Sequence, residues 1–163
     1  MDYLNNIQSK ILLDRSEVEN ILAVWRFKDQ KVVFTNGCFD IIHRGHVEYL
    51  AQAASLGDQL IIGLNTDESV KRLKGPSRPM QDENTRALVL AAFSFVAKVV
   101  LFDEDTPYEL IKLVKPNILV KGGDYKPEDI VGYDIVTSNG GAVITIDLVE
   151  GHSTTSIINK MGR

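Results

Sequence analysis

The sequence predicts a doubly wound α/β fold, in which a parallel sheet of five strands carries helices on both faces. Short runs of β-branched and apolar residues alternate with segments in which apolar residues recur at helical spacing. The connections between these segments are short and contain glycine, proline and helix-capping residues. Such an alternation is typical of parallel strands joined by crossover helices.

Length and composition favour one domain. The 163 residues suffice for a single hydrophobic core, and we expect an N-terminal helical extension at 1–30 and the domain itself at 31–163. A net charge of −4 argues against nucleic-acid binding. The single cysteine, Cys38, excludes an internal disulfide, and we expect it to be a packing residue. With no visible leader or membrane-spanning stretch, we expect a cytoplasmic protein without a membrane partner.

The N-terminal segment has the pattern of an amphipathic helix. Ser16 and Glu19 can form a capping box at its start. The apolar residues that follow recur at helical spacing, and we expect Trp25 to fill the core rather than to stack on a base; they are Val18, Ile21, Leu22 and Trp25.

From residue 31 onward, strands and helices alternate. The expected strands are 32–35, 59–64, 98–102, 118–121 and 142–146. The expected helices are 44–55, 67–73, 82–95, 107–114 and 127–139, with a last helix that begins near Ser153. Thr106 and Pro107 provide an N-cap and a first helical residue, and Gly140-Gly141 stops the helix before the last strand.

Ligands of open α/β sheets bind beyond the carboxyl ends of the strands. This rule collects five polar segments on one rim of the sheet: 35–46, 65–67, 102–105, 121–125 and 148–156. We expect Asn65 and Asp67, in the second of these segments, to contact a substrate.

His43 and His46 lie three residues apart at the start of the first crossover helix. Side chains at this spacing share a helix face, and the N–H groups of a first helical turn attract an anion. Gly45 leaves the backbone bare between the two histidines. A metal pair is the competing interpretation, but no third His or Cys lies nearby in the sequence to complete a zinc site. The pattern therefore indicates a phosphate site.

Two further segments admit both a structural and a binding role. Lys121-Gly122-Gly123-Asp124 can be a tight turn, or its glycines can admit a nucleotide while Asp124 accepts hydrogen bonds from hydroxyl groups. The run Ser153-Thr154-Thr155-Ser156 can cap a helix, or it can bind a second face of a phosphate chain. Positive charge for a phosphate substrate comes from a few cations in or beside these loops: Arg44, Lys71, Arg72, Lys74, Arg78 and Lys121.

Residues 37–46, Gly-Cys-Phe-Asp-Ile-Ile-His-Arg-Gly-His, resemble the G-x-F-D-x-x-H-x-G-H signature of the nucleotidyltransferase superfamily, which includes cytidylyltransferases and small adenylyltransferases. Residues 150–155 resemble its second signature, E-G-I-S-T-T. Segments 35–40, 72–79 and 119–128 are similar to the bacterial D-glycero-β-D-manno-heptose 1-phosphate adenylyltransferases. The resemblance covers residues 32 to about 160 and implies a Rossmann-like fold of the nucleotidyltransferase type.

The resemblance also implies roles for individual residues. His43 and His46 would contact the triphosphate of ATP, and Lys74 and Lys121 would supply catalytic positive charge. Arg78 and Arg86 would contact substrate, and Asp40 would organise its loop or help to hold Mg²⁺. The remaining implied ATP contacts are Thr35, Asn36, Gly37, Cys38, Phe39, Gly45, Gly122, Gly123, Asp124, Ser153, Thr154 and Thr155.

The implied reaction joins AMP from ATP to a sugar 1-phosphate, in the synthesis of ADP-heptose for lipopolysaccharide. The expected partners are these small molecules and a second copy of the chain in a homodimer. Glycerol-3-phosphate or ethanolamine-phosphate cytidylyltransferase activity is an alternative, as is a nucleotide-sensing module without catalysis. Leu148 stands where cytidylyltransferases commonly carry an arginine, which weakens the cytidylyltransferase alternative.

Overall fold

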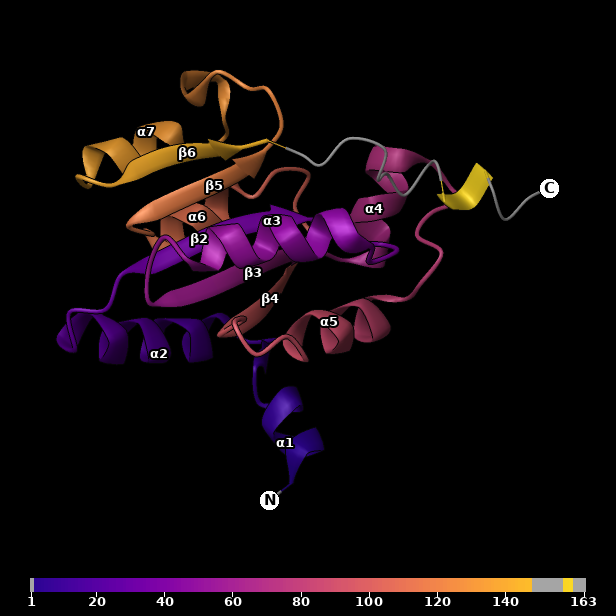
Figure 1. Ribbon diagram of the computed structural model, residues 1–163, viewed down its shortest axis with the longest axis horizontal. Helices are drawn as coiled ribbons and strands as arrows, with labels where there is room; N and C mark the ends of the chain where they lie inside the picture. The colour runs from indigo at the N-terminus through magenta and orange to yellow at the C-terminus, as the bar shows by residue number, and fades with distance from the viewer. Residues whose placement is uncertain (1, 148–156, 160–163) are drawn as a thin grey trace.

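The computed structural model describes residues 2–147 and 157–159 and has at its centre a parallel sheet of strand order β1-β4-β3-β2-β5-β6 (Figure 1). The strands are β1 (Ile11–Leu12), β2 (Val32–Gly37), β3 (Gln59–Asn65), β4 (Lys98–Phe102), β5 (Ile118–Gly122) and β6 (Ala142–Ile146). The helices are α1 (Tyr3–Gln8), α2 (Arg15–Phe27), α3 (Arg44–Ala54), α4 (Asp67–Lys74), α5 (Glu83–Ala91), α6 (Tyr108–Val114), the 3-10 turn η1 (Pro127–Asp129) and α7 (Tyr133–Ser138). The predicted doubly wound α/β fold is confirmed.

The sheet has six strands, so the predicted count of five is wrong. The additional strand, β1, lies in the segment that we expected to be entirely helical, and its residues Ile11 and Leu12 pair with Val99 and Val100 of β4. A strand of two residues is too short to show a period in the sequence. The predicted boundary at residue 31 stays a prediction, although β1 joins the sheet from the N-terminal side of it.

Three predicted helix details are also wrong. The N-cap of α6 is Pro107 and its first helical residue is Tyr108, so Thr106 does not cap this helix. α2 is capped by Asp14, whose carboxylate accepts a hydrogen bond from the Ser16 N–H, so the capping box of Ser16 and Glu19 does not form. The helix expected at 127–139 is divided into η1 and α7. Gly132 separates them with a φ of +91°, and a Cβ there would lie 2.7 Å from Ile111 Cδ1. Only glycine meets both the backbone and the packing requirement at this position.

Apolar side chains cover both faces of the sheet. On one face, α2, α6 and α7 bury residues such as Leu22, Ile111 and Val136. On the other face, α3 and α5 bury Leu50 and Leu90. Trp25 is 7% exposed within the first cluster, which confirms its expected place in the core. Within the described residues, no helix has the length and apolar character needed to cross a bilayer.

Because all the paired strands run parallel, the loops that follow them meet at one edge of the sheet. β2 lies in the sheet between β3 and β5, and the loop that leads to α3 follows it directly. The candidate phosphate residues and the segment at 121–125 therefore lie beside each other at this edge.

Leu22→Ala tests whether the N-terminal segment belongs to the core. Leu22 is 1% exposed, and we expect its truncation to lower the free energy of unfolding by about 3 kcal/mol. Val24→Ala on the same helix is the control, because Val24 is 45% exposed and its truncation is expected to change stability by less than about 0.5 kcal/mol. Urea denaturation measures both, and equal small effects would contradict an integral N-terminal segment.

Candidate active site

His43 and His46 form a stacked pair at the N-terminus of α3. His43 is the N-cap in an extended backbone conformation, and its carbonyl accepts hydrogen bonds from the N–H groups of His46 and Val47 at 2.9 and 3.2 Å. The two imidazole centroids lie 3.9 Å apart with an interplanar angle of 23°. Phe39 contacts His46 edge-to-face at 5.3 Å. The spacing of three residues thus brings the rings together on one side of the first turn, as the sequence predicted.

His46 is electrically neutral at pH 7. Burial lowers the pKa of its imidazole to about 4, and the positive charges of His43 and Lys74 act in the same direction, whereas a backbone hydrogen bond with Ile41 opposes them. Its Nδ1 is buried and has no hydrogen-bond partner among the described residues. A buried polar atom of this kind is costly to leave unsatisfied, so His46 is prepared to bind a polar ligand.

A cavity of about 320 Å³ adjoins the histidine pair. It lies between the end of β2, the C-terminal residue of α4 and the end of β5, at the edge of the sheet where ligands of such folds bind. Its lining residues are Asn36, Gly37, Cys38, Phe39, Asp40, His46, Tyr49, Lys74, Lys121, Gly122 and Tyr125. We call this space the phosphate cavity. Nine of these eleven residues were predicted site residues; Tyr49 and Tyr125 were not.

Lys74 and Lys121 bring positive charge to the phosphate cavity from two different elements, α4 and β5. Burial lowers the pKa of the Lys121 ammonium, an effect that only an ionised Cys38 would oppose. An anion beside Lys121 would stabilise the charged ammonium in return. Burial raises the pKa of Cys38 against the lowering effects of Lys74, Arg86 and Arg78, so the thiol stays protonated and is not an activated nucleophile.

The Asp40 carboxylate fixes a loop through hydrogen bonds within the protein and is not free to bind a ligand. Its side chain is 1% exposed and accepts hydrogen bonds from Arg78 Nε at 2.7 Å, from the Met80 N–H at 2.8 Å and from the Gln81 N–H at 3.0 Å. Burial alone would raise the pKa of Asp40, but these three donors lower it below its ordinary value. Of the two predicted roles, organising the loop agrees with these contacts.

Arg78 is the side-chain partner of Asp40 in this ion pair. Its side chain is 15% exposed, and its Nε points at Asp40. Its Nη2, however, is buried without a hydrogen-bond partner in the part of the chain that the structure describes. The guanidinium therefore fixes the loop with one nitrogen and retains another for a ligand.

Arg86 does not lie where substrate contact requires it, and that expectation is corrected. The residue is 0% exposed. Its Nη1 donates to the carbonyls of Cys38 and Asn65 at 2.7 and 2.8 Å, its Nη2 to the Asp67 carboxylate at 2.7 Å, and its Nε to the Gln81 carbonyl at 3.0 Å. Arg86 thus joins the loops after β2 and β3 to the segment before α5.

Asn65 and Thr35 are also buried and engaged within the protein, so the expected substrate and ATP contacts of their side chains are corrected as well, whereas the expected substrate contact of the half-buried Asp67 stays a prediction. Asn65 is 4% exposed, and its Nδ2 donates to Ser69 Oγ at 2.9 Å. The Asp67 carboxylate accepts the hydrogen bond from Arg86 Nη2 described above. Thr35 is 0% exposed, and its hydroxyl lies 2.6 Å from the Tyr49 hydroxyl. All three stabilise the base of the site and lie outside the lining of the phosphate cavity.

The turn after β5 contributes Gly122 to the cavity, whereas Gly123 and Asp124 are not among its lining residues. Gly123 has a φ of +111°, and its N–H donates to the Ile146 carbonyl at 3.0 Å. Gly45 is buried in the first turn of α3. The predicted phosphate contacts Ser153, Thr154 and Thr155, like Leu148, lie outside the described residues.

Tyr49 and Tyr125 were missed for different reasons. Tyr49 follows His46 by three residues on α3, so helical spacing placed it on the same face and could have indicated it. Burial raises the pKa of its hydroxyl to about 12, and it serves as a hydrogen-bonding core residue beside the cavity. Tyr125 follows a glycine turn whose path no periodicity predicts.

The described residues do not form a protein-made magnesium site. No group of three or more His, Cys, Asp or Glu side chains suited to a metal occurs among residues 2–147 and 157–159. The oxygens of Asp40, the predicted helper, already accept three hydrogen bonds from Arg78, Met80 and Gln81. The expected Mg²⁺ therefore stays a prediction.

The fold, the motif at the end of β2 and the cationic cavity define a class of protein. Residues 34–160 match the family described as cytidylyltransferase-like, and the chain belongs to that family. The chain is 58% identical to the bifunctional protein HldE of Syntrophotalea carbinolica over 94% of its length and 54% identical to that of Azorhizobium caulinodans over 91%. It spans 31% of the length of each of these relatives.

Two crystal structures share the fold. The lipopolysaccharide core biosynthesis protein from Thermoplasma volcanium aligns with a TM-score of 0.61 and 26% identity, over 76% of this chain and 99% of that chain. The pantoate-beta-alanine ligase from Francisella tularensis aligns with a TM-score of 0.57 and 16% identity, over 93% of this chain and 77% of that chain, which shows the fold alone.

A titration of the histidine rings tests the electrostatics of the pair. Because the pKa of His46 in the folded protein is about 4, below its ordinary value of 6.5, its contribution to stability is complete above pH 6.5 and is lost as the pH falls towards 4. We expect the His46 ring resonances in ligand-free protein to titrate with a midpoint near pH 4 by NMR. His46→Asn assigns the signal, and a midpoint near 6.5 would contradict this description.

Asp40→Asn tests the loop anchor. At pH 7 we expect it to lower the free energy of unfolding by about 2 kcal/mol, because hydrogen bonds to a charged acceptor are weakened. The pKa of Asp40 is depressed in the folded state, so its contribution is present above the ordinary value of 3.8 and is lost as the pH falls below it. The stability difference between wild type and variant should therefore stay nearly constant from pH 7 to about 5 and shrink as the pH falls below 3.8. A difference that stays constant down to about pH 2.5 would contradict it.

Proposed function

We propose that this chain is a nucleotidyltransferase that transfers AMP from ATP to D-glycero-β-D-manno-heptose 1-phosphate and releases pyrophosphate. The observation that carries the proposal is the stacked pair of His43 and His46 at the N-terminus of α3, beside a cavity that also receives Lys74 and Lys121. The family supports the reaction type. The similarity to HldE proteins and to a lipopolysaccharide core biosynthesis protein supports a sugar phosphate as acceptor.

In the proposed step, an oxygen of the sugar phosphate attacks the α-phosphorus of ATP in line. A new bond forms between that oxygen and the α-phosphorus. The bond from the α-phosphorus to the oxygen that bridges to the β-phosphorus breaks, and pyrophosphate leaves with its electron pair. The attacking phosphate is already an anion, so no strong general base is required. Catalysis depends on alignment and on stabilising the charge that develops on pyrophosphate.

Different residues of the site contribute to alignment and to charge stabilisation. The first turn of α3 offers N–H groups and the positive end of a helix dipole to the phosphates. Neutral His46 can donate a hydrogen bond through one ring nitrogen without the cost of burying a charge. Lys74 and Lys121 carry the compensating charge, and the donors are held in place by Asp40 and Arg86, so little reorganisation is needed when the phosphates arrive.

Several finer expectations stay predictions. Magnesium can accompany ATP as a complex with its phosphates, but the described residues offer it no cluster and we assign it no step. The choice of ATP over CTP follows from the similarity of segments 35–40, 72–79 and 119–128 and from Leu148. A homodimer and a cytoplasmic location are likewise predictions. Pyrophosphate release with ATP or CTP against heptose 1-phosphate and glycerol 3-phosphate separates the candidate activities directly.

His43→Ala and His46→Ala should each lower turnover by about a hundredfold, because each removes a donor aimed at developing charge. Gln52→Ala is the matched control, since Gln52 is an exposed residue on the same helix and lies outside the phosphate cavity. Pyrophosphate release at saturating ATP and acceptor is the measurement, with circular dichroism to verify the fold. Wild-type turnover in a folded double variant would refute the proposed role.

A further inference from the structure

The strands β2 and β5 part before they reach the phosphate cavity. They pair at only two positions, the last of which joins Phe34 to Leu119, although β2 continues to Gly37 and β5 to Gly122. On their other sides both strands stay paired to the end, β2 with β3 as far as Gly37 and β5 with β6 as far as Gly122. The sheet therefore opens between β2 and β5, and we call this opening the seam.

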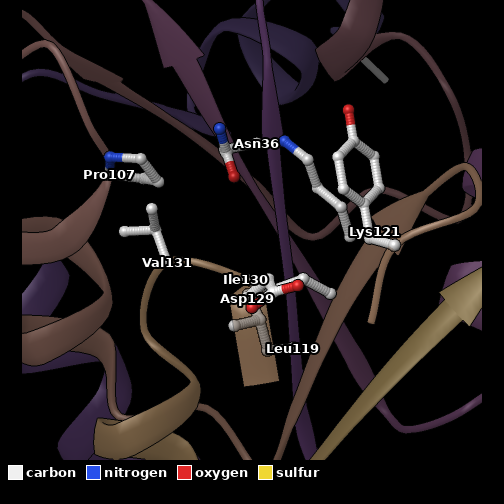
Figure 2. A pocket seen from close by; sticks show the side chains of 8 residues that line it. Asn36, Pro107, Leu119, Lys121, Asp129, Ile130 and Val131 are labelled. Atoms are coloured by element: carbon white, nitrogen blue, oxygen red, sulfur yellow. The ribbon is translucent and has the colours of Figure 1, made fainter. Parts of the chain in front are cut away.

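Two cavities border the seam. Asn36 of β2 and Lys121 of β5 line the phosphate cavity and also a second cavity, of about 220 Å³ (Figure 2). In the view of Figure 2, the side chains of Asn36 and Lys121 extend from the two strands towards the same space. The separation of β2 and β5 therefore sets how far apart the groups on the two sides of the seam lie.

The hydroxyl group of Tyr49 bridges the seam. It donates a hydrogen bond to the Val120 carbonyl at 3.3 Å and lies 2.6 Å from the Thr35 hydroxyl. Because a phenol has one proton and Val120 receives it, Thr35 is the donor in the shorter contact. The Tyr49 oxygen also accepts a hydrogen bond from the Gly122 backbone. With one donated and two accepted hydrogen bonds, the hydroxyl has no capacity left for a ligand.

These contacts replace hydrogen bonds that the β2–β5 ladder lacks. Gly123 donates its N–H to the Ile146 carbonyl of β6 at 3.0 Å. Backbone groups of successive residues in a strand point to opposite sides, so the Gly122 N–H and the Val120 carbonyl point towards β2. In a continuing parallel ladder, one residue of β2 would bind both groups. The Tyr49 hydroxyl binds them instead, and its bond with Thr35 ties it to β2.

Tyr49 also connects the seam to the histidine pair. It follows His46 by three residues on α3, so the two side chains share a helix face, and both line the phosphate cavity. Lys121 stands between the two β5 residues whose backbone groups bind the Tyr49 hydroxyl. One buried hydroxyl therefore fixes the start of α3 relative to the strand that carries Lys121.

We propose that Tyr49 is a positioning residue, whose hydroxyl closes the seam and sets the distance between His46 and Lys121 across the phosphate cavity. This inference rests on the proposed function and adds to it a residue that acts through two others rather than on a phosphate. Such a residue affects the rate, because a displacement of about 1 Å in a reacting geometry costs on the order of a hundredfold.

Tyr49→Phe removes the hydroxyl and leaves the ring in the core, and two controls match it. Tyr108→Phe removes a hydroxyl that donates to Asp134 at 2.8 Å, away from both cavities. Ile111→Val removes one methylene from a side chain that is 0% exposed on the other face of the sheet. We expect Tyr49→Phe and Ile111→Val each to lower the melting temperature by about 3 °C, so general destabilisation is equal in both.

Amide hydrogen exchange measures the seam without any substrate. In Tyr49→Phe we expect the Gly122 amide to exchange about tenfold faster than in Ile111→Val, because its hydrogen-bond acceptor is gone. The Gly123 amide, which is bonded to Ile146, should exchange within about twofold of the same rate in both variants. Equal exchange of the Gly122 amide in the two variants would overturn the inference, whether or not wild type transfers a nucleotide.

The kinetic readout is pyrophosphate release with ATP and D-glycero-β-D-manno-heptose 1-phosphate. We expect Tyr49→Phe to lower kcat by about tenfold and to leave the KM for ATP within about threefold of wild type, because alignment matters most in the transition state. Tyr108→Phe and Ile111→Val should match wild type. A kcat of Tyr49→Phe equal to that of the controls would overturn the inference. Absence of turnover in wild type would count against the proposed function alone, and the Gly122 exchange rate would still decide whether Tyr49 closes the seam.

Discussion

The site depends on two buried charged side chains that hold the loop between β2 and α3 from beneath. Asp40 gathers Arg78 and the N–H groups of Met80 and Gln81, while Arg86 binds the carbonyls of Cys38, Asn65 and Gln81. A buried charge is tolerated only when its hydrogen-bonding capacity is filled, so each of these contacts restricts the loop. These contacts also fix the position of His43 and His46, because the two histidines immediately follow the anchored loop.

In this site, different residues carry the positive charge and donate the neutral hydrogen bonds. Burial keeps His46 neutral, whereas Lys74 and Lys121 bring ammonium groups from other elements of the sheet edge. A site made of charged imidazoles would have to bury two like charges 3.9 Å apart between ring centroids, which the stacked geometry makes unfavourable. A neutral His46 at the helix N-terminus avoids that repulsion and can still donate to phosphate oxygens. Lys121 has a second importance, because it is the only cation that lines both described cavities.

Local patterns in the sequence sufficed for the fold class, whereas most residues that line the phosphate cavity were expected from the resemblance to nucleotidyltransferases. β4 and β6 have the predicted bounds because each is a short apolar run between clear breakers. β1 could not be predicted, since two residues form a strand only by pairing with β4, a long-range interaction. Arg86 was expected at the substrate only because the family resemblance implied it; its burial depends on loops that are distant in sequence. Tyr125 depends in the same way on a turn whose backbone only tertiary packing determines.

The central claim is that the two imidazoles and the first turn of α3 receive the phosphate chain of a nucleotide. The most direct test is a crystal structure with a non-hydrolysable ATP analogue whose α,β-bridging oxygen is replaced by a methylene group. The account predicts phosphate oxygens within hydrogen-bonding distance of both His43 and His46, with Lys121 next to the α-phosphate. A nucleotide bound with its phosphates away from the N-terminus of α3, and with both rings in contact only with protein, would contradict it.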